Sequence, residues 1–245
     1  MADYLRKRSA ERVHVVVHLS GAHAYGFPSP DSDLDLKAIH IAPTEAFLGL
    51  SRRDSTVDQI VDIEGVEVDY TSNELGPVLS GVLKGNGNYL ERILGTTSAA
   101  SSDLLLELQP IVARSVSRLV AAHYRGFAFQ QRRSLAEKPT AKRLLYVLRT
   151  ALTGIHALRT GVIDPHLPTL AREYHLDGVD EVIVRKRKGE QVELDEHALG
   201  SWQERLDALF VRLDEEVSRS PLPAEAPNFS EVDEWLVEAR RRFVP

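Results

Sequence analysis

The chain has 245 residues, of which 43% are hydrophobic and 27% are charged, and its net charge is −6. It contains no cysteine, which excludes disulfides, thiolate nucleophiles and cysteine-based metal sites. The negative net charge excludes a global basic field, so any contact with nucleic acid must use a local patch. The apolar run Val15–Val17 is too short for a signal peptide or a membrane span. We therefore expect a cytoplasmic protein that makes no membrane contact.

Strand-forming segments concentrate before residue 72. They are rich in β-branched residues or alternate between polar and apolar side chains, which is typical of strands. A segment rich in glycine and proline separates the first two and predicts a turn. The predicted elements are a helix at Asp3–Arg12, a buried strand at Val13–Leu19, a turn at 21–32, a strand at 33–41, and a hairpin of strands 56–63 and 66–72 with Gly65 between them.

From residue 73 onward the apolar residues follow a helical period. The clearest case is Pro139–Gly161, where leucines recur along one helix face and Gly161 stops the helix. The predicted helical segments are 73–86, 88–95, 103–137 with a bend near Pro110, 139–161, 195–220 and 230–243, and a proline-rich linker covers 218–230. This order predicts an α+β chain with a small mixed β-sheet domain at residues 1–100 and an α-helical domain at residues 101–245.

Three aspartates are the candidates for chemistry. Asp33 and Asp35 share one face of a predicted strand, and Asp69 lies on the polar face of a later strand. If these strands are neighbours, the three carboxylates converge, and a hard divalent cation offsets their repulsion. Asp-x-Asp alone is a weak signal, because surface charges near strand ends look the same; the glycine turn upstream makes it more specific, since its N–H groups can bind phosphate. Lys37, on the same face, either neutralises the carboxylates or meets a phosphate.

The stretch "SGAHAYGFPSPDSDLDL" (residues 20–36) resembles the signature of the DNA polymerase β-like nucleotidyltransferases, a Gly-Ser turn followed by Asp-x-Asp on a strand and a third acidic residue on a later strand. Together with "FLGL" (Phe47–Leu50) and "LKGNGNYLERIL" (Leu83–Leu94), it resembles more narrowly the RNA-repair, or RNA-ligase-associated, nucleotidyltransferases. The resemblance covers the first hundred residues well. The helical remainder matches loosely, mainly around "KRLLYVLRTALTGIHALRTG" (142–161).

This resemblance implies a metal site and a reaction. Asp33, Asp35 and Asp69 are expected to hold Mg²⁺ (or Mn²⁺), and Asp69 is also expected to act as base toward the attacking hydroxyl. The implied activity transfers a nucleoside monophosphate from an NTP to an acceptor hydroxyl, with an RNA end as a candidate acceptor, and releases pyrophosphate. Positioning and charge neutralisation supply most of what such chemistry needs.

The expected nucleotide-binding residues are Ser20, Gly21, Ala22, Ser32, Lys142 and Arg149. By the resemblance, Gly21 opens the triphosphate-binding turn. Ala22 stands where the family usually has serine, which removes one phosphate hydrogen bond worth about 1–3 kcal/mol. Ser32 either bonds a phosphate or caps the turn.

Lys142 and Arg149 belong to a basic span, residues 125–149, with seven basic residues and one acidic residue. This span is either a wall that binds the triphosphate and guides an RNA end, or a solvated helix face. We interpret the second basic run, Arg185–Lys188, as a solvated loop.

Two alternatives to RNA end modification stay open. One is nucleotidyl transfer to a protein or a small molecule. The other is a catalytically silent nucleotide-binding module, for which Ala22 is the main support and the three intact aspartates are the main objection. The sequence leaves the nucleotide, the acceptor and the oligomeric state open.

Overall fold

The computed structural model describes residues 1–47, 55–189 and 191–243. Internal contacts divide the chain into two units. The first unit consists of Met1–Ser20, Asp33–Val116 and Glu225–Pro245, and the second of Gly21–Ser32 and Ser117–Ala224. Within the "FLGL" motif, residues 48–50 lie outside the described part of the chain.

The first unit contains a mixed sheet, which confirms the predicted α+β class. Its described strands are β1 (Val13–Leu19), β2 (Leu34–Ile41), β3 (Thr56–Ile63), β4 (Val66–Glu74) and β5 (Ser98–Ser101), in the order β3-β4-β2-β1-β5. The β2–β4 pair is parallel and the other pairs are antiparallel. The strand β2 begins at Leu34, so Asp33 immediately precedes it.

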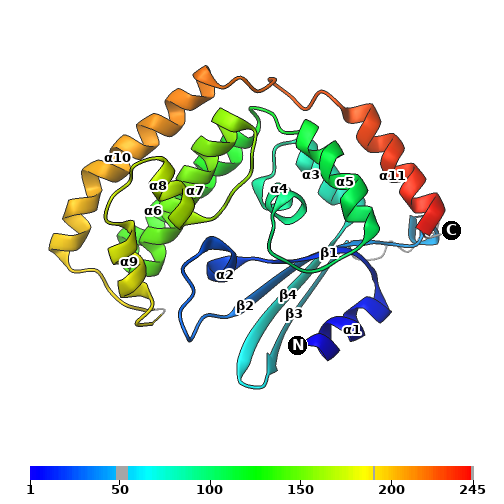
Figure 1. Cartoon of the computed structure of the whole chain (residues 1–245), viewed down its shortest axis with the longest axis horizontal. Helices are drawn as coiled ribbons and strands as arrows, with labels where there is room; N and C mark the ends of the chain where they lie inside the picture. Colours follow the sequence, from blue (N-terminus) through cyan, green and yellow to red (C-terminus); the bar gives the residue numbers. More distant parts are fainter. Residues whose placement is uncertain (48–54, 190, 244–245) are drawn as a thin grey trace. The chain divides into compact units, whose positions relative to one another are not determined.

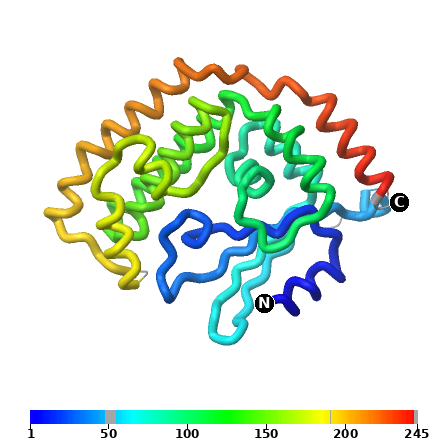
Figure 2. The backbone as a smooth tube through the Cα atoms, viewed as in Figure 1, coloured from blue at the N-terminus to red at the C-terminus, as the bar shows by residue number. Residues whose placement is uncertain are grey.

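A two-residue turn joins β3 to β4, as predicted. Glu64 and Gly65 both have positive φ angles, 56° and 82°. Such a pair matches the right-handed twist of the strands on either side of a tight hairpin. Figure 2 shows this hairpin as the cyan loop that extends beyond the other strands.

The two faces of the sheet differ in character. Helix α1 (Ala2–Glu11) covers one face, where Tyr4 and Leu5 pack against a buried cluster of strand residues. Helices α3 (Leu75–Leu83), α4 (Gly87–Leu94) and α5 (Asp103–Arg114) lie on the other face (Figure 1), and α11 (Phe229–Phe243) contacts α3 and α5. The buried cluster under α1 is Val17, Leu36, Ala38, Val68 and Tyr70.

Two predictions about the elements were wrong, and one strand was missed. The glycine-rich segment begins with a short helix, α2 (Gly21–Tyr25), instead of an open turn. The segment 103–137 forms two helices, α5 and α6 (Val120–Glu137), and not one bent helix. Helix α5 ends at Arg114, and Pro110 lies inside it. Strand β5 was not predicted, since "SAAS" is short, polar and at the sheet edge, where few side chains reach a core.

The second unit is helical around α7 (Ala141–Thr160). Its leucine face is buried, Thr140 caps its first turn by accepting a hydrogen bond from the Arg143 N–H, and Gly161 follows its last residue. The predicted helix at 139–161 is therefore confirmed. Besides α2 and α6, this unit contains α8 (Leu167–Glu173), α9 (Val179–Lys186) and α10 (Glu196–Arg219). None of the described helices combines the length and apolar composition that a membrane span requires.

His18 on β1 makes stability depend on pH. Burial lowers the pKa of His18 to about 4, and the Arg92 guanidinium acts in the same direction. Because an unfolded histidine has a pKa of about 6.5, the unfolded state binds more protons between these values, and stability falls as pH drops from about 6.5 to 4. Between roughly pH 7 and pH 5, we expect protonation of His18 to lower the unfolding free energy of the wild type by about 2 kcal/mol. The His18→Asn variant should lack this loss, and urea unfolding at the two pH values measures it.

The matched control is His197→Asn, at an exposed position of α10. It should keep the wild-type pH dependence. If the pH dependence of His18→Asn equals that of the wild type, His18 is not the group responsible.

Candidate functional site

The parallel β2–β4 pair brings together two of the predicted carboxylates. Asp35 and Asp69 are direct register partners. Leu36 and Tyr70, the next residues on each strand, point into the core under α1, so alternation places both aspartates on the opposite sheet face. Their side chains are 29% and 38% exposed. Asp33 is exposed directly before β2.

Lys37 lies between these two carboxylates. Its Nζ donates a hydrogen bond of 2.7 Å to Asp69 Oδ2 and lies 3.9 Å from Asp35 Oδ1. It also donates to Thr71 Oγ1 at 3.2 Å. Of the two roles that the sequence left open, this geometry favours neutralisation of the aspartates. A compact ammonium offsets the repulsion of two carboxylates that face each other across a strand pair.

The donor set fits a hard divalent cation in its chemistry. Asp35 and Asp69 offer carboxylate oxygens from neighbouring strands, and both are partly open to solvent. In the described residues, however, no group of three or more His, Asp or Glu side chains is arranged so that it could hold a metal ion. Coordination by Asp33, Asp35 and Asp69 together therefore stays a prediction.

Ser20 supports the strand that carries Asp35. Its backbone N–H donates a hydrogen bond of 2.8 Å to the Asp35 carbonyl. The preceding residue, Leu19, donates in turn to the Thr97 carbonyl at 2.8 Å. The end of β1 is thus fixed on both sides, at the place where the chain leaves the first unit.

In the second unit, residues 21–32 form a segment that we call the glycine segment. Gly21 begins α2, and Ala22 is buried with its carbonyl accepting from the Phe27 N–H at 3.1 Å. Gly26 follows with φ +87°, and a Cβ there would lie 2.5 Å from His166 Nε2. Glycine is therefore required at position 26 for both its conformation and its contacts.

Arg149 packs against an aromatic residue of the glycine segment. Its guanidinium carbon lies 3.9 Å from the centre of the Tyr25 ring, and the side chain is nearly fully buried. Tyr25 and Phe27 both meet the ring of Tyr146 edge to face. Burial and the Arg149 charge lower the pKa of His123 to about 4. Arg149 therefore has a packing role here, and its contact with nucleotide stays a prediction.

Ser32 belongs to a hydrogen-bonded network at the end of the glycine segment. Lys186, which is 0% exposed, donates from Nζ to Ser29 Oγ at 2.7 Å and to Ser32 Oγ at 2.6 Å. Ser29 donates to Asp31 Oδ1 at 2.6 Å, and the Ser32 hydroxyl also accepts from the Ser29 N–H. Two roles were considered for Ser32, a phosphate contact and a cap of the turn. These hydrogen bonds support the second role.

The interpretation of Arg185–Lys188 as a solvated loop was wrong at Lys186. This residue is the last of α9, and it shares a buried face with Val179, Val182 and Ile183. The spacing of these apolar residues was the available signal, because positions three and four apart lie on one helix face. The run of neighbouring charges obscured it.

Lys142 faces a cavity of about 330 Å³ beside α7. The cavity is mainly polar, which suits a charged or hydrogen-bonding ligand. The space is large enough for part of a nucleotide. Its lining is Gln131, Ser134, Thr140, Lys142, Arg143, Tyr146 and Gln191.

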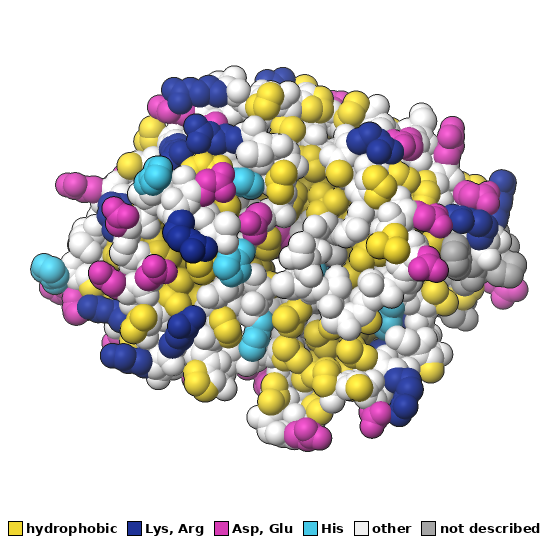
Figure 3. All heavy atoms as spheres, viewed as in Figure 1, with side chains coloured by type: hydrophobic (Ala, Val, Ile, Leu, Met, Phe, Trp, Pro, Cys, Tyr) yellow, Lys and Arg dark blue, Asp and Glu magenta, His cyan; other side chains and the backbone are white. Residues whose placement is uncertain are grey.

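The basic span 125–149 is partly neutralised by α10. Arg125 pairs with Asp214 at 2.6 Å, and Arg132 pairs with Asp207 at 2.5 Å. On the face shown in Figure 3, acidic and basic side chains are interspersed. The positive charge that the sequence concentrates in this span is therefore reduced by acidic residues distant in the chain.

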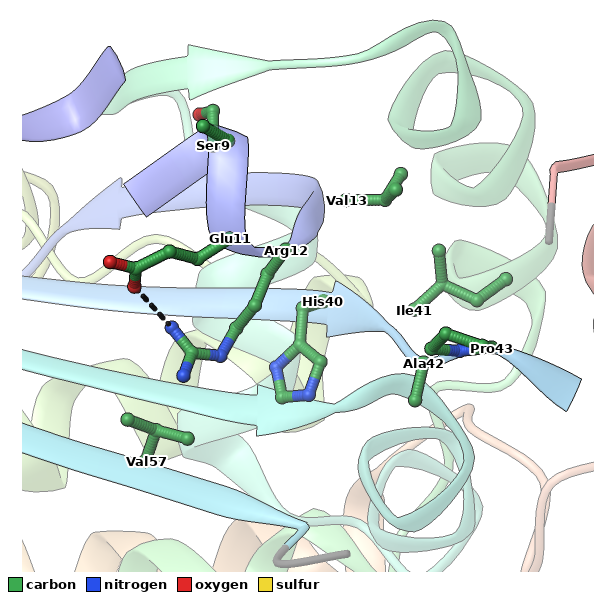
Figure 4. Close-up of a pocket in the computed structure, with 10 residues that line it drawn as sticks. Ser9, Glu11, Arg12, Val13, His40, Ile41, Ala42, Pro43 and Val57 are labelled. Carbon is green, nitrogen blue, oxygen red and sulfur yellow. Dashed lines mark hydrogen bonds and ion pairs between the residues drawn. The ribbon is translucent and has the colours of Figure 1, made fainter. Parts of the chain in front are cut away.

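A second cavity, of about 390 Å³, lies at the other end of β1 and β2 from the aspartates. Figure 4 shows the Glu11–Arg12 ion pair, with Arg12 extending beside the His40 imidazole. Burial lowers the pKa of His40 to about 4, and the Arg12 charge acts in the same direction, so the imidazole is neutral near pH 7. No predicted site residue lines this cavity.

Comparisons with known proteins gave a family, a curated relative and a solved structure. The model of the RNA repair pathway DNA polymerase beta family matches residues 3–238. An uncharacterized protein of Methanocaldococcus jannaschii is 32% identical over 152 residues, which are 61% of this chain and 62% of that relative, so the chain spans less than two thirds of it. The crystal structure of a nucleotidyltransferase-like protein from Exiguobacterium sibiricum 255-15 aligns with 98% of this chain and 78% of its own, at 13% identity and a TM-score of 0.35.

We expect Lys186→Met to destabilise the second unit. The substitution keeps the apolar stem but removes the donor to Ser29 and Ser32, and the loss of these two hydrogen bonds costs about 1–3 kcal/mol. Urea unfolding measures the loss. Lys188→Met, at an exposed position, is the control and should unfold like the wild type. Equal stability of the two variants would show that the Lys186 network does not hold the glycine segment.

Proposed function

Because the chain belongs to the RNA repair pathway DNA polymerase beta family, we propose that it is a Mg²⁺-dependent nucleotidyltransferase. It moves a nucleoside monophosphate from an NTP to an acceptor hydroxyl and releases pyrophosphate. The observation that supports this most directly is the register of the parallel strands, in which Asp35 faces Asp69. Paired carboxylates on one sheet face are what this chemistry requires near a triphosphate.

Each aspartate has a proposed role. Asp33, Asp35 and Asp69 would hold Mg²⁺ (or Mn²⁺), which when bound neutralises charge on the triphosphate. The Asp69 carboxylate accepts the proton of the acceptor hydroxyl. The hydroxyl oxygen then bonds to the α-phosphorus, the bond from that phosphorus to the bridging oxygen breaks, and pyrophosphate leaves with its electron pair. Ser20, Gly21, Ala22 and Ser32 are proposed to position the phosphates.

The acceptor is proposed to be an RNA end, and the support for it is the RNA repair description of the family. The pairing of Arg125 and Arg132 with acidic residues of α10 limits the positive charge that the helical unit can offer to a long RNA. A short end or a single hydroxyl therefore suits this chain better than an extended duplex. Transfer to a protein or small-molecule hydroxyl, and a catalytically silent module, are the other outcomes of the experiment.

We expect Asp69→Ala to reduce transfer by about 10³-fold or more, because both a metal ligand and the proton acceptor are lost. The assay incubates the protein with each α-labelled NTP, Mg²⁺ or Mn²⁺, and either total RNA or lysate protein. Label in one fraction identifies the acceptor. NTP binding without label in any fraction would support the silent module.

The matched control is Asp233→Ala, which removes one exposed carboxylate from α11 in the same unit. It should transfer at the wild-type rate. Circular dichroism of both variants checks that the fold is kept. Transfer by Asp69→Ala near the wild-type rate would remove Asp69 from the mechanism.

Lys142→Ala should raise the KM for NTP by about ten-fold with kcat little changed, because a lost phosphate contact that is equally strong in ground state and transition state weakens binding only. Arg133→Ala, which removes an exposed positive charge from α6, separates this effect from a general loss of charge. Steady-state kinetics of both variants make the comparison. An equal KM in the two variants would show that Lys142 makes no specific contact with the NTP.

A further inference from the structure

Lys37 makes three contacts that together define a cation position on the sheet. Its Nζ lies 2.7 Å from Asp69 Oδ2, 3.2 Å from Thr71 Oγ1 and 3.9 Å from Asp35 Oδ1. The side chain is only 18% exposed, less than either aspartate. The ammonium is therefore held among oxygen atoms and partly shielded from water. A charge held in this way interacts more strongly with its neighbours than a fully solvated one.

Two of these oxygen atoms belong to Asp35 and Asp69, which are proposed to hold the divalent cation. A metal ion bound to Asp69 Oδ2 would need the oxygen that now accepts the Lys37 hydrogen bond. It would also bring two positive charges close to the ammonium, which is unfavourable at short distance. Lys37 and the metal ion therefore compete for Asp69.

We propose that Lys37 is a built-in counter-ion of Asp35 and Asp69, and that a divalent cation binds to these aspartates by displacing its ammonium. This inference rests on the proposed function for the identity of the ligand. It adds that Lys37 lowers the metal affinity of the nucleotide-free protein while keeping its carboxylates stably paired. Lys37 is thus a positioning residue, acting on the metal through Asp69.

Lys37 changes the net charge that the carboxylates present to a metal ion. Asp33, Asp35 and Asp69 with Lys37 carry a net charge of −2, which a single divalent cation neutralises. Without Lys37 the same carboxylates carry −3 and attract a metal ion more strongly. A lysine at this position therefore sets the concentration of metal ion at which the nucleotide-free protein fills its site.

Direct titration with Mn²⁺, followed by electron paramagnetic resonance of the free ion, tests the proposal without nucleotide or acceptor. We expect Lys37→Met to bind Mn²⁺ about ten-fold more tightly than the wild type, because the competing charge is gone. Without metal, the same variant should unfold at a lower temperature, since Asp35 and Asp69 then repel each other, and Mn²⁺ should restore the loss. Lys37→Gln provides the same measurement where Lys37→Met does not fold.

A double-mutant cycle with Asp69→Asn isolates the competition. In the Asp69→Asn background, the gain from Lys37→Met should shrink, because the oxygen for which the two cations compete has lost its charge. An equal gain in both backgrounds would mean that Lys37 acts through the general field, and would overturn the proposal. Lys7→Met, at an exposed position of α1, removes the same charge on the other side of the sheet and should leave Mn²⁺ affinity unchanged.

The readout separates this inference from the proposed function. Tighter Mn²⁺ binding by Lys37→Met in a protein that transfers no nucleotide would support the counter-ion and contradict the enzyme. Transfer activity in the wild type with equal Mn²⁺ affinity in wild type and Lys37→Met would do the reverse. Absence of Mn²⁺ binding in both proteins would overturn the inference together with the metal dependence.

Discussion

The parallel pairing of β2 with β4 is the constraint on which the candidate site depends. It puts Asp35 opposite Asp69, an arrangement that repulsion alone would disfavour. The register is set from the other face of the sheet, where Val68 and Tyr70 are buried under α1. A shift of one residue would turn these two toward solvent and Asp69 into the core. Hydrophobic packing on one face thus fixes the position of the carboxylates on the other.

Much of this arrangement can be predicted from the sequence because it follows from periodicity. Alternation along the strands is enough to place Asp35 and Lys37 on one face, and Asp69 on the polar side of its own strand. The sequence could not decide whether Lys37 neutralises the aspartates or meets a phosphate. That choice depends on which strands are neighbours and on the register between β2 and β4, which are distant in the sequence. The local sequence pattern carries no information about either.

Two interpretations of charge patterns depended on side chains whose partners are far away in the sequence. Lys186 lies in a run of four basic residues, which usually indicates a solvated segment. Its partners include Ser29 and Ser32, whose hydroxyls accept hydrogen bonds from the buried amine. Likewise, two arginines of the basic span 125–149, Arg125 and Arg132, have acidic partners on α10. A charge pattern along a sequence shows where the charges are, but it does not show which of them are neutralised by residues distant in the chain.

The glycine segment is shaped by residues far from the motif to which it belongs. The signature residues fall within the first hundred positions, yet the family model matches residues 3–238. Within the second unit, Tyr146, His166 and Lys186 contact the glycine segment through an aromatic edge, a close approach to Gly26 and a buried ammonium. The conformation of a turn expected to bind phosphate is therefore determined by residues more than a hundred positions later. A chain that lacked residues 117–224 would lose the packing that shapes this segment.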